Sequence, residues 1–440
     1  MRDHTGHIEL SREDAVDQIL RVIEVDGGQK KPSIDRVPLN EAYGRVLAED
    51  IYAKTDIPNV RSCAMDSIAV RWDHFQGLAE GELPDTSGWV RGVDWEFANT
   101  GVAMPTDFDT AIVIEHVIVS DDEQHVEIAA APSERFAGTR EAGSTFRRGD
   151  LIVEKGCVIA PDIAAQIASA GYASIEVAAK PRVAFIATGN ELVSPNIPFA
   201  SDAPEKFAGI GKVYESNSAV VQGKVEAWGG IFIPFDIVPD EREAIRAAVV
   251  KACSVADIVV LNAGSSKGSD DWSVEVLEGM GTIICHETKH GPGHHSSYAF
   301  VENTPIVGIS GPSGGASFTL NFYLLPIMKS LLGLDPTPRL IPAVLFEEFP
   351  ARAVKKPDQT GKPSGEARPS VVLPDDEFYA IRFVTLEAGE QGNLVATPVK
   401  GHPGSAQMQK ANAYYMMPMN ESKAPRKGDV IKVELRNASL

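Results

Sequence analysis

The stretch DIVVLNAGSSKGSDD, residues 257–271, contains the pattern that decides the fold. Its first half is an apolar run rich in β-branched residues, which is typical of a strand covered on both faces in an α/β sheet. Its second half is a turn of glycine, serine and lysine that ends in two aspartates. Backbone N–H groups in such a turn bind phosphate, and carboxylates bind hard cations. The stretch therefore predicts a buried strand followed by a ligand-binding turn.

Strands and helices alternate on both sides of this stretch. Short apolar or β-branched runs predict strands at 182–187, 231–238, 282–286 and 304–310, and helical spacing predicts helices at 217–228, 241–253, 274–280 and 315–332. Such alternation is typical of a doubly wound α/β domain. It begins after Pro181 and ends near residue 332.

The regions outside this domain have different patterns. Ser11 and Asp14 predict the start of an N-terminal helix, which we expect to pack with a second helix that begins at Pro161. Residues 51–142 are rich in turns and short alternating runs, which indicates a β-rich module. Short strands after Gly333 indicate a second, C-terminal β domain.

Composition limits the possible partners. The chain has 440 residues and a formal net charge of −20, which repels polyanions, so we expect no nucleic-acid partner. No apolar run is long enough to cross a bilayer, and the first residues have no apolar segment of a secretory signal, so we expect a cytoplasmic protein without membrane contact. Four widely spaced cysteines are typical of isolated thiols.

Three turns follow predicted strands of the α/β domain: ATGNEL at 187–192, NAGSSKGSDD at 262–271 and GISGPSGGAS at 308–317. Carboxyl ends of parallel strands meet at one edge of a sheet, so these turns predict a ligand cleft there. The candidate phosphate-binding residues of the cleft are Gly264, Ser265, Ser266, Gly268, Ser310, Gly311 and Ser313.

The histidine-rich stretch HETKHGPGHH, residues 286–295, contains the letters H-E-x-x-H of zinc proteases. Those proteases place both histidines on one helical face, but a β-prone run precedes this stretch and Gly-Pro-Gly interrupts it. Two interpretations remain open. The histidines are solvated residues of a loop at the sheet edge, or they meet an oxyanion together with backbone N–H groups of the turn.

Several segments, in order along the chain, resemble the molybdopterin molybdenumtransferase family, which includes MoeA and the gephyrin E domain. The block GRVLAEDIYAKTDIPNVRSCAMDSIAVR resembles the family's segment with S-A-M-D-G-Y-A-V-R, and TGVAMP resembles T-G-A-x-x-P. ATGNEL, GKVYESNS, NAGSSKGSDD and GISGPSGGAS stand where the family has S-T-G-D-E-L, G-x-I-x-D-S-N, S-G-G-V-S-x-G-x-x-D and G-L-P-G-N-P-V-S. The resemblance covers nearly the whole chain.

The resemblance implies a MoeA-like homodimer of four-domain subunits. These would be a split helical domain (8–50 and 143–180), a β-rich domain (51–142), an α/β molybdopterin-binding domain (181–332) and a C-terminal β domain (333–440). It also implies insertion of molybdate, or a related oxyanion, into adenylylated molybdopterin with Mg²⁺ and release of AMP. The cleft would combine the α/β domain of one subunit with the β-rich domain of the other.

The resemblance assigns roles to individual residues. Asp66, Asp240 and Asp271 are the candidate catalytic acids, and together with Glu191 they are the candidate Mg²⁺ ligands. Thr100 is a candidate substrate-binding residue. Oxygen ligands of this kind suit Mg²⁺.

The chain also departs from the family pattern. REAGSTF replaces R-G-E-D-I near Thr145, and KHGPGHH replaces a lysine-bearing K-P-G-K-P loop, so His290, His294 and His295 become the candidate anion-binding residues. Because histidine titrates near neutral pH, anion affinity should be weaker and pH-dependent. The alternative function is therefore a non-catalytic MoeA-like protein that binds molybdopterin or the finished molybdenum or tungsten cofactor.

Overall fold

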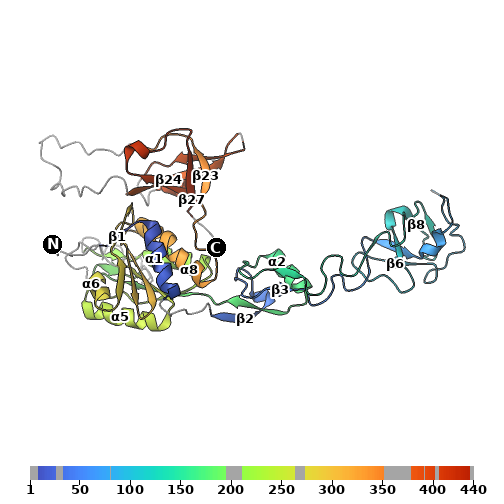
Figure 1. The fold of residues 1–440 in the computed structure, drawn as a ribbon, viewed down its shortest axis with the longest axis horizontal. Helices are drawn as coiled ribbons and strands as arrows, with labels where there is room; N and C mark the ends of the chain where they lie inside the picture. The colour runs from blue at the N-terminus through green and yellow to red at the C-terminus, as the bar shows by residue number, and fades with distance from the viewer. Residues whose placement is uncertain are drawn as a thin grey trace, which may run out of the picture. The chain divides into compact units, whose positions relative to one another are not determined.

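A computed structural model describes residues 8–25, 33–79, 81–194, 211–262, 273–350, 378–390, 392–401 and 406–436. The chain divides into two compact units (Figure 1). One unit combines residues 1–33 with 178–440, and the other contains residues 34–177. No helix in the described ranges is both long enough and apolar enough to cross a membrane.

The larger unit contains a six-stranded sheet in the order β16-β13-β17-β22-β21-β18. The strands β16 (Ile231–Pro234), β13 (Arg182–Ala187), β17 (Ile258–Asn262) and β22 (Thr304–Ile309) are parallel. The strand β21 (Ser297–Val301) runs antiparallel to both β22 and β18 (Thr282–Cys285). This topology confirms the predicted α/β domain.

The two faces of the sheet bury alternating residues of each strand. In β13, Val183 and Phe185 lie in one core with Val221 of α4, whereas Ala184 and Ile186 lie in another with Val249 of α5. Apolar residues therefore occupy consecutive positions, because both faces are covered. The first face is covered by α1 (Arg12–Val25), α4 (Asn217–Ala227) and a longer helical segment. That segment consists of α7 (Ser313–Thr319), a π-helical turn (Leu320–Leu324) and α8 (Leu325–Leu331). The second face is covered by α5 (Arg242–Val255) and α6 (Ser273–Glu278) (Figure 1).

The N-terminal helix α1 (Arg12–Val25) corrects one expectation. Its first turn is capped as predicted, since the Asp14 N–H donates to Ser11 Oγ at 3.0 Å. However, Ala15 and Ile19 are buried in the α/β core, and the helix packs against α8 and β18. The helix α2 (Pro161–Ser169), its expected partner, belongs to the other unit. The domain boundaries that we drew remain a prediction.

The C-terminal strands form a closed ring. β24 (Tyr379–Ala388), β25 (Leu394–Pro398), β23 (Ile341–Leu345), β27 (Val430–Leu435) and β26 (Ala413–Pro418) are paired in this order, and β26 pairs back with β24. This barrel-like arrangement confirms the predicted C-terminal β domain. The short strand β20 (His290–Gly291) comes from the histidine-rich stretch and adds to β24 in parallel.

Four further short strands of the larger unit form two parallel pairs. β1 (Glu9–Leu10) pairs with β19 (Glu287–Thr288), and β14 (Leu192–Val193) pairs with β15 (Val213–Tyr214). The first pair connects the N-terminal residues with the histidine-rich stretch.

The smaller unit is rich in β-structure, as predicted for residues 51–142. Its central strand β5 lies between β6 and β7, and the core around it contains Trp95, Ile68 and Ile112. The elements of this unit are β2 (Ile34–Pro38), β3 (Ile51–Tyr52), β4 (Ser62–Cys63), β5 (Ser67–Val70), β6 (Trp95–Ala98), β7 (Thr110–Val113), β8 (Val117–Val119), β9 (Val126–Ile128), β10 (Thr139–Arg140), β11 (Leu151–Val153), α2 and β12 (Ser174–Ala178).

A buried ion pair joins α1 to the C-terminal barrel. The guanidinium of Arg12 donates to both carboxylate oxygens of Glu434, and Tyr414 Oη donates to the same carboxylate at 3.0 Å. Arg12 also lies 3.9 Å above the ring of Phe322. The side chains of Arg12 and Glu434 are only 5% and 12% exposed. Each buried charge is therefore neutralised by its partner rather than by water.

We predict that Arg12→Met lowers the free energy of unfolding of the larger unit by about 3–5 kcal/mol, because it leaves the Glu434 carboxylate buried without its cation. Urea denaturation measures this difference. The control is Arg21→Met, which removes an exposed pair with Asp17 and should cost about 0.5 kcal/mol. Equal losses in the two variants would contradict the assigned role of Arg12.

Candidate functional site

A cavity of about 310 Å³ lies at the carboxyl edge of the parallel strands. Thr188 and Glu191 follow β13, Asn262 ends β17, and Gly311 and Pro312 follow β22; all five line this cavity. The structure thus brings Glu191 and Gly311 together, as expected for turns at one edge of the sheet. The part of the middle turn that contains Gly264, Ser265, Ser266, Gly268 and Asp271 lies outside the described residues.

The side chain of Asn217 holds the cavity wall together. Its Nδ2 donates to Asn262 Oδ1 at 3.1 Å and to the Gly311 carbonyl at 2.8 Å. Its Oδ1 is buried and accepts no hydrogen bond from the described residues. Because buried polar atoms are normally satisfied, this oxygen is a candidate acceptor for a ligand N–H or O–H group.

Glu215 positions Asn217 at the start of α4. The Glu215 carboxylate accepts the Asn217 N–H at 2.6 Å and the Ser218 N–H at 3.0 Å, which are first-turn donors of the helix. Both side chains line the cavity, and neither was among the predicted site residues. The available signal was the run of polar residues ESN directly before a helix, next to a strand that ends in Asn262.

A second cavity of about 410 Å³ lies beside the first and shares Gly311 and Pro312 with it. His294 and His295 line this cavity together with Ser310 and Gly311. The predicted histidine loop and the predicted turn after β22 therefore share one wall. Ser313 is the first residue of α7 and lines neither cavity.

His290 is part of the core rather than of the cavity surface. Its side chain has no exposed surface, Nδ1 donates to the Pro292 carbonyl at 3.2 Å, and Nε2 accepts from Tyr323 Oη at 2.9 Å. Burial lowers the pKa of His290 to about 3, so the imidazole is neutral. With both nitrogens engaged, His290 cannot bind an anion, and we withdraw it from the site.

Asp240 supports the turn that carries Glu191. Its Oδ2 accepts the Asn190 N–H at 2.9 Å. The Glu191 carboxylate folds over Gly189, where a Cβ atom would lie 2.9 Å from both carboxylate oxygens. Gly189 has a φ of 154°, and a Cβ atom there would also lie 2.8 Å from Leu192 Cγ, so the backbone at this position favours glycine.

Asp66 and Thr100 form a pair in the smaller unit. Asp66 Oδ1 accepts the Thr100 N–H at 2.9 Å and the Thr100 hydroxyl at 3.0 Å. These two hydrogen bonds lower the pKa of Asp66, because they stabilise the carboxylate. Both residues are exposed, so the pair is accessible to a ligand.

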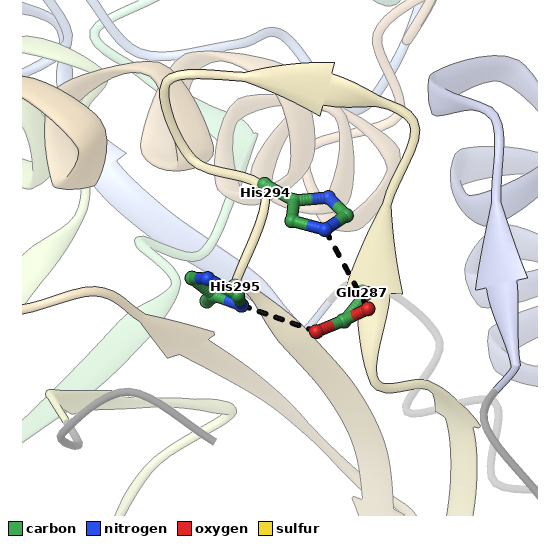
Figure 2. Close-up of side chains that lie close together, drawn as sticks. All are labelled: Glu287, His294 and His295. Atoms are coloured by element: carbon green, nitrogen blue, oxygen red, sulfur yellow. Dashed lines mark hydrogen bonds and ion pairs between the residues drawn. The ribbon is translucent and has the colours of Figure 1, made fainter. Parts of the chain in front are cut away.

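The letters H-E-x-x-H do not form a helical zinc site. Residues 286–291 contain the strands β19 and β20, His286 pairs with Glu278 at 3.0 Å, and His290 contacts Pro292 and Tyr323 instead. The structure instead groups Glu287 with His294 and His295, whose ligand atoms all lie within 4.8 Å of one another (Figure 2).

Comparisons with known proteins agree with this architecture. Residues 10–171 match the family described as MoeA N-terminal region (domain I and II), and residues 184–330 match the family described as probable molybdopterin binding domain. The proteins named molybdopterin molybdenumtransferase from Staphylococcus epidermidis and Staphylococcus aureus strain COL are each 28% identical over 327 residues, which is 71% of this chain and 75% of the relative.

Two solved structures share the fold. The molybdopterin biosynthesis MoeA protein from Pyrococcus horikoshii OT3 has a TM-score of 0.70 and 21% identity, and the alignment covers 97% of this chain and 100% of that chain. A molybdenum cofactor biosynthesis protein from Pyrococcus furiosus has a TM-score of 0.55 and 18% identity, with the same coverage.

The fold and the matched regions define a multidomain protein with a molybdopterin-binding type of α/β domain. The N-terminal match, the α/β match and the curated relatives cover most of the chain. The chain belongs to the MoeA family and is a MoeA-like transferase.

We predict that Thr100→Val raises the pKa of Asp66 toward its ordinary value, because the variant removes one of the two donors to the carboxylate. Because the pKa of Asp66 is lower in the folded than in the unfolded state, its carboxylate stabilises the folded state at pH values above the unfolded pKa. This stabilisation is lost as the pH falls through the folded pKa of Asp66. Carboxyl-carbon NMR titration measures the shift. Thr106→Val, on the same exposed surface segment, should leave Asp66 unchanged; an unaltered Asp66 titration in Thr100→Val would refute the prediction.

Proposed function

We propose that the chain acts in molybdenum cofactor biosynthesis, by inserting molybdate or a related oxyanion into adenylylated molybdopterin with release of AMP. The observation that carries this proposal is the cavity formed by the turns after β13 and β22 and by Asn262 at the end of β17, within the region that matches a molybdopterin-binding domain. Clefts at this edge of parallel sheets are the usual place for phosphate-containing ligands.

Each part of the cavity suits a different part of this substrate. The phosphate would bind at the turn that contains Ser310 and Gly311 and at the glycine- and serine-rich segment 264–268, because segments of this composition commonly bind phosphate through backbone N–H groups. Asn217 Oδ1, which is buried without a partner among the described residues, suits an N–H group of the pterin. The oxyanion would occupy the adjoining cavity beside His294 and His295.

The proposed reaction requires removal of the adenylate. Hydrolysis adds water across the phosphoanhydride bond, and the products are AMP and a pterin phosphate. Bound Mg²⁺ would neutralise the charge that develops on the phosphates. The donor chemistry fits, because Glu191 offers a carboxylate at the cavity and Asp240 supports its turn. We propose Asp66, Asp240 and Asp271 as the other ligands.

We further propose a cytoplasmic homodimer in which Asp66 and Thr100 of one subunit complete the cleft of the other. Their exposure in the smaller unit supports such a role, since the two residues are preorganised by two hydrogen bonds and remain accessible.

A binding role without hydrolysis is the second candidate function. It is favoured by His294 and His295 at the cavity, where the family pattern has lysines, because an imidazole is a weaker general attractor of phosphate than an ammonium group. Incubation with adenylylated molybdopterin, molybdate and Mg²⁺ distinguishes the two functions. AMP release supports the transferase, and binding without AMP supports the second function.

We predict that Glu191→Gln lowers the rate of AMP release by roughly 10- to 100-fold, because it removes a charged metal ligand and preserves the shape of the side chain. Liquid chromatography of AMP under single-turnover conditions measures the rate. Glu226→Gln changes an exposed glutamate on α4 and serves as the matched control. Equal rates in both variants would exclude Glu191 from the metal site.

A further inference from the structure

Glu287, His294 and His295 form a three-residue cluster, which we call the loop triad (Figure 2). His294 Nε2 lies 3.5 Å from Glu287 Oε2, and His295 Nδ1 lies 3.2 Å from Glu287 Oε1. Two ligands bound at about 2.0–2.1 Å to one tetrahedral ion lie about 3.3 Å apart. The two distances join the histidines to different oxygens of Glu287, and one ligand atom from each residue lies within 4.8 Å of the others. Small side-chain movements would therefore bring the triad to the spacing of a metal-ligand set.

The hydrogen bonding of His294 leaves its Nε2 available to a proton or a metal ion at the Glu287 carboxylate. Its Nδ1 donates to the Thr288 carbonyl at 2.6 Å, so the proton of a neutral imidazole is on Nδ1. Nε2 then directs a lone pair at the Glu287 carboxylate, an arrangement that is repulsive unless a proton or a metal ion lies between the two groups. A histidine that donates its other N–H to a backbone carbonyl is typical of a metal ligand.

The backbone around the triad is fixed on both sides. Glu287 belongs to β19, which pairs with β1. His290 and Gly291 form β20, which pairs with β24. Thr288 is fully buried and donates its hydroxyl to the Gly293 carbonyl at 3.2 Å. Binding of an ion would therefore need little rearrangement, which favours affinity.

The position of the triad leaves one side of the ion open. His294 and His295 line the second cavity, whereas the Glu287 side chain is 11% exposed and does not line it. Three protein ligands leave at least one coordination position for a small molecule. Because imidazole nitrogens favour zinc and its neighbours over Mg²⁺, the site suits a late first-row transition metal.

We propose that the loop triad binds a divalent transition-metal ion of the Zn²⁺ type, and that this ion holds an oxyanion in the cavity next to Ser310 and Gly311. A dication and one carboxylate leave a net positive charge at the cavity wall. Glu9 Oε1 lies 3.8 Å from His294 Nδ1 and would offset part of this charge, so the oxyanion would bind mainly by coordination to the ion. The identity of the oxyanion as molybdate rests on the proposed function, but the metal site does not.

Metal binding is tested on untagged, full-length protein that has been treated with a chelator. Titration with Co²⁺ should give visible bands of tetrahedral intensity that saturate at one ion per chain, and Zn²⁺ should displace them. In His295→Ala the Zn²⁺ affinity should fall by about 100-fold or more, since even the loss of a residue outside the ligand set costs roughly 10- to 100-fold. His125→Ala, at an exposed histidine of the smaller unit, should bind as the unmodified chain does.

Absence of Co²⁺ bands in the unmodified chain, or unchanged affinity in His295→Ala, would overturn the metal site. A second variant, Glu287→Gln, keeps the size of the side chain and should also lose binding; thermal melting of both variants shows whether they are folded. If Glu287→Gln loses metal binding but is also misfolded, the affinity of His295→Ala decides whether the metal site exists.

Oxyanion binding is tested on the Co²⁺ form by addition of molybdate or inorganic phosphate. A shift of the visible bands supports an open position at the metal, and unchanged bands at saturating anion exclude it. These readouts need no pterin and no Mg²⁺. Failure of the metal site would leave AMP release unaffected, and failure of AMP release would leave the Co²⁺ spectrum unaffected, so the two proposals are tested separately.

Discussion

Parallel pairing of β13, β17 and β22 is the constraint on which the site depends. It aligns Ala187 with Asn262 and Asn262 with Ile309, so the three strands end at one level. The Asn217 amide then bridges the end of β17 and the turn after β22 by hydrogen bonds to Asn262 and Gly311. A change in register of one residue would move these polar groups to another level and would leave Asn217 Nδ2 buried without acceptors.

The histidine-rich stretch shows how one segment can join three parts of a fold. Glu287 pairs with the N-terminal strand, His290 pairs with the barrel and is buried against Tyr323, and His294 and His295 reach the cavity. The buried ion pair of Arg12 with Glu434 connects the same N-terminal and C-terminal parts. The geometry of the loop therefore depends on residues that are distant in sequence, and the loop is held more rigidly than its glycines suggest.

Much of the fold could be predicted from the sequence, because both faces of the sheet are covered and its strands are continuous apolar runs such as IVVLN. The packing of α1 could not, because an amphipathic helix indicates that one face is buried without indicating against which partner. The same limit applies to the histidines. His290 and His294 look equivalent in sequence, but one is a neutral core residue and the other lines a cavity. Asn217 was missed because a polar residue before a helix is usually an exposed cap.

The loop triad offers a physical reason for histidines at an anion-binding cavity in a chain of net charge −20. A lysine supplies one positive charge on a flexible stem, and its ammonium group is strongly hydrated. A metal ion held by two imidazoles and one carboxylate supplies a net charge of similar size, but at a fixed point and with a vacant coordination position that an oxyanion can fill directly. Binding of an anion to a fixed metal ion costs less conformational entropy than binding to a flexible lysine. The metal ion itself binds only when its histidine and glutamate ligands carry no proton at the coordinating atoms. Lysines attract anions of many kinds by their charge alone. A metal ion in this triad would instead bind one anion by coordination at one defined position.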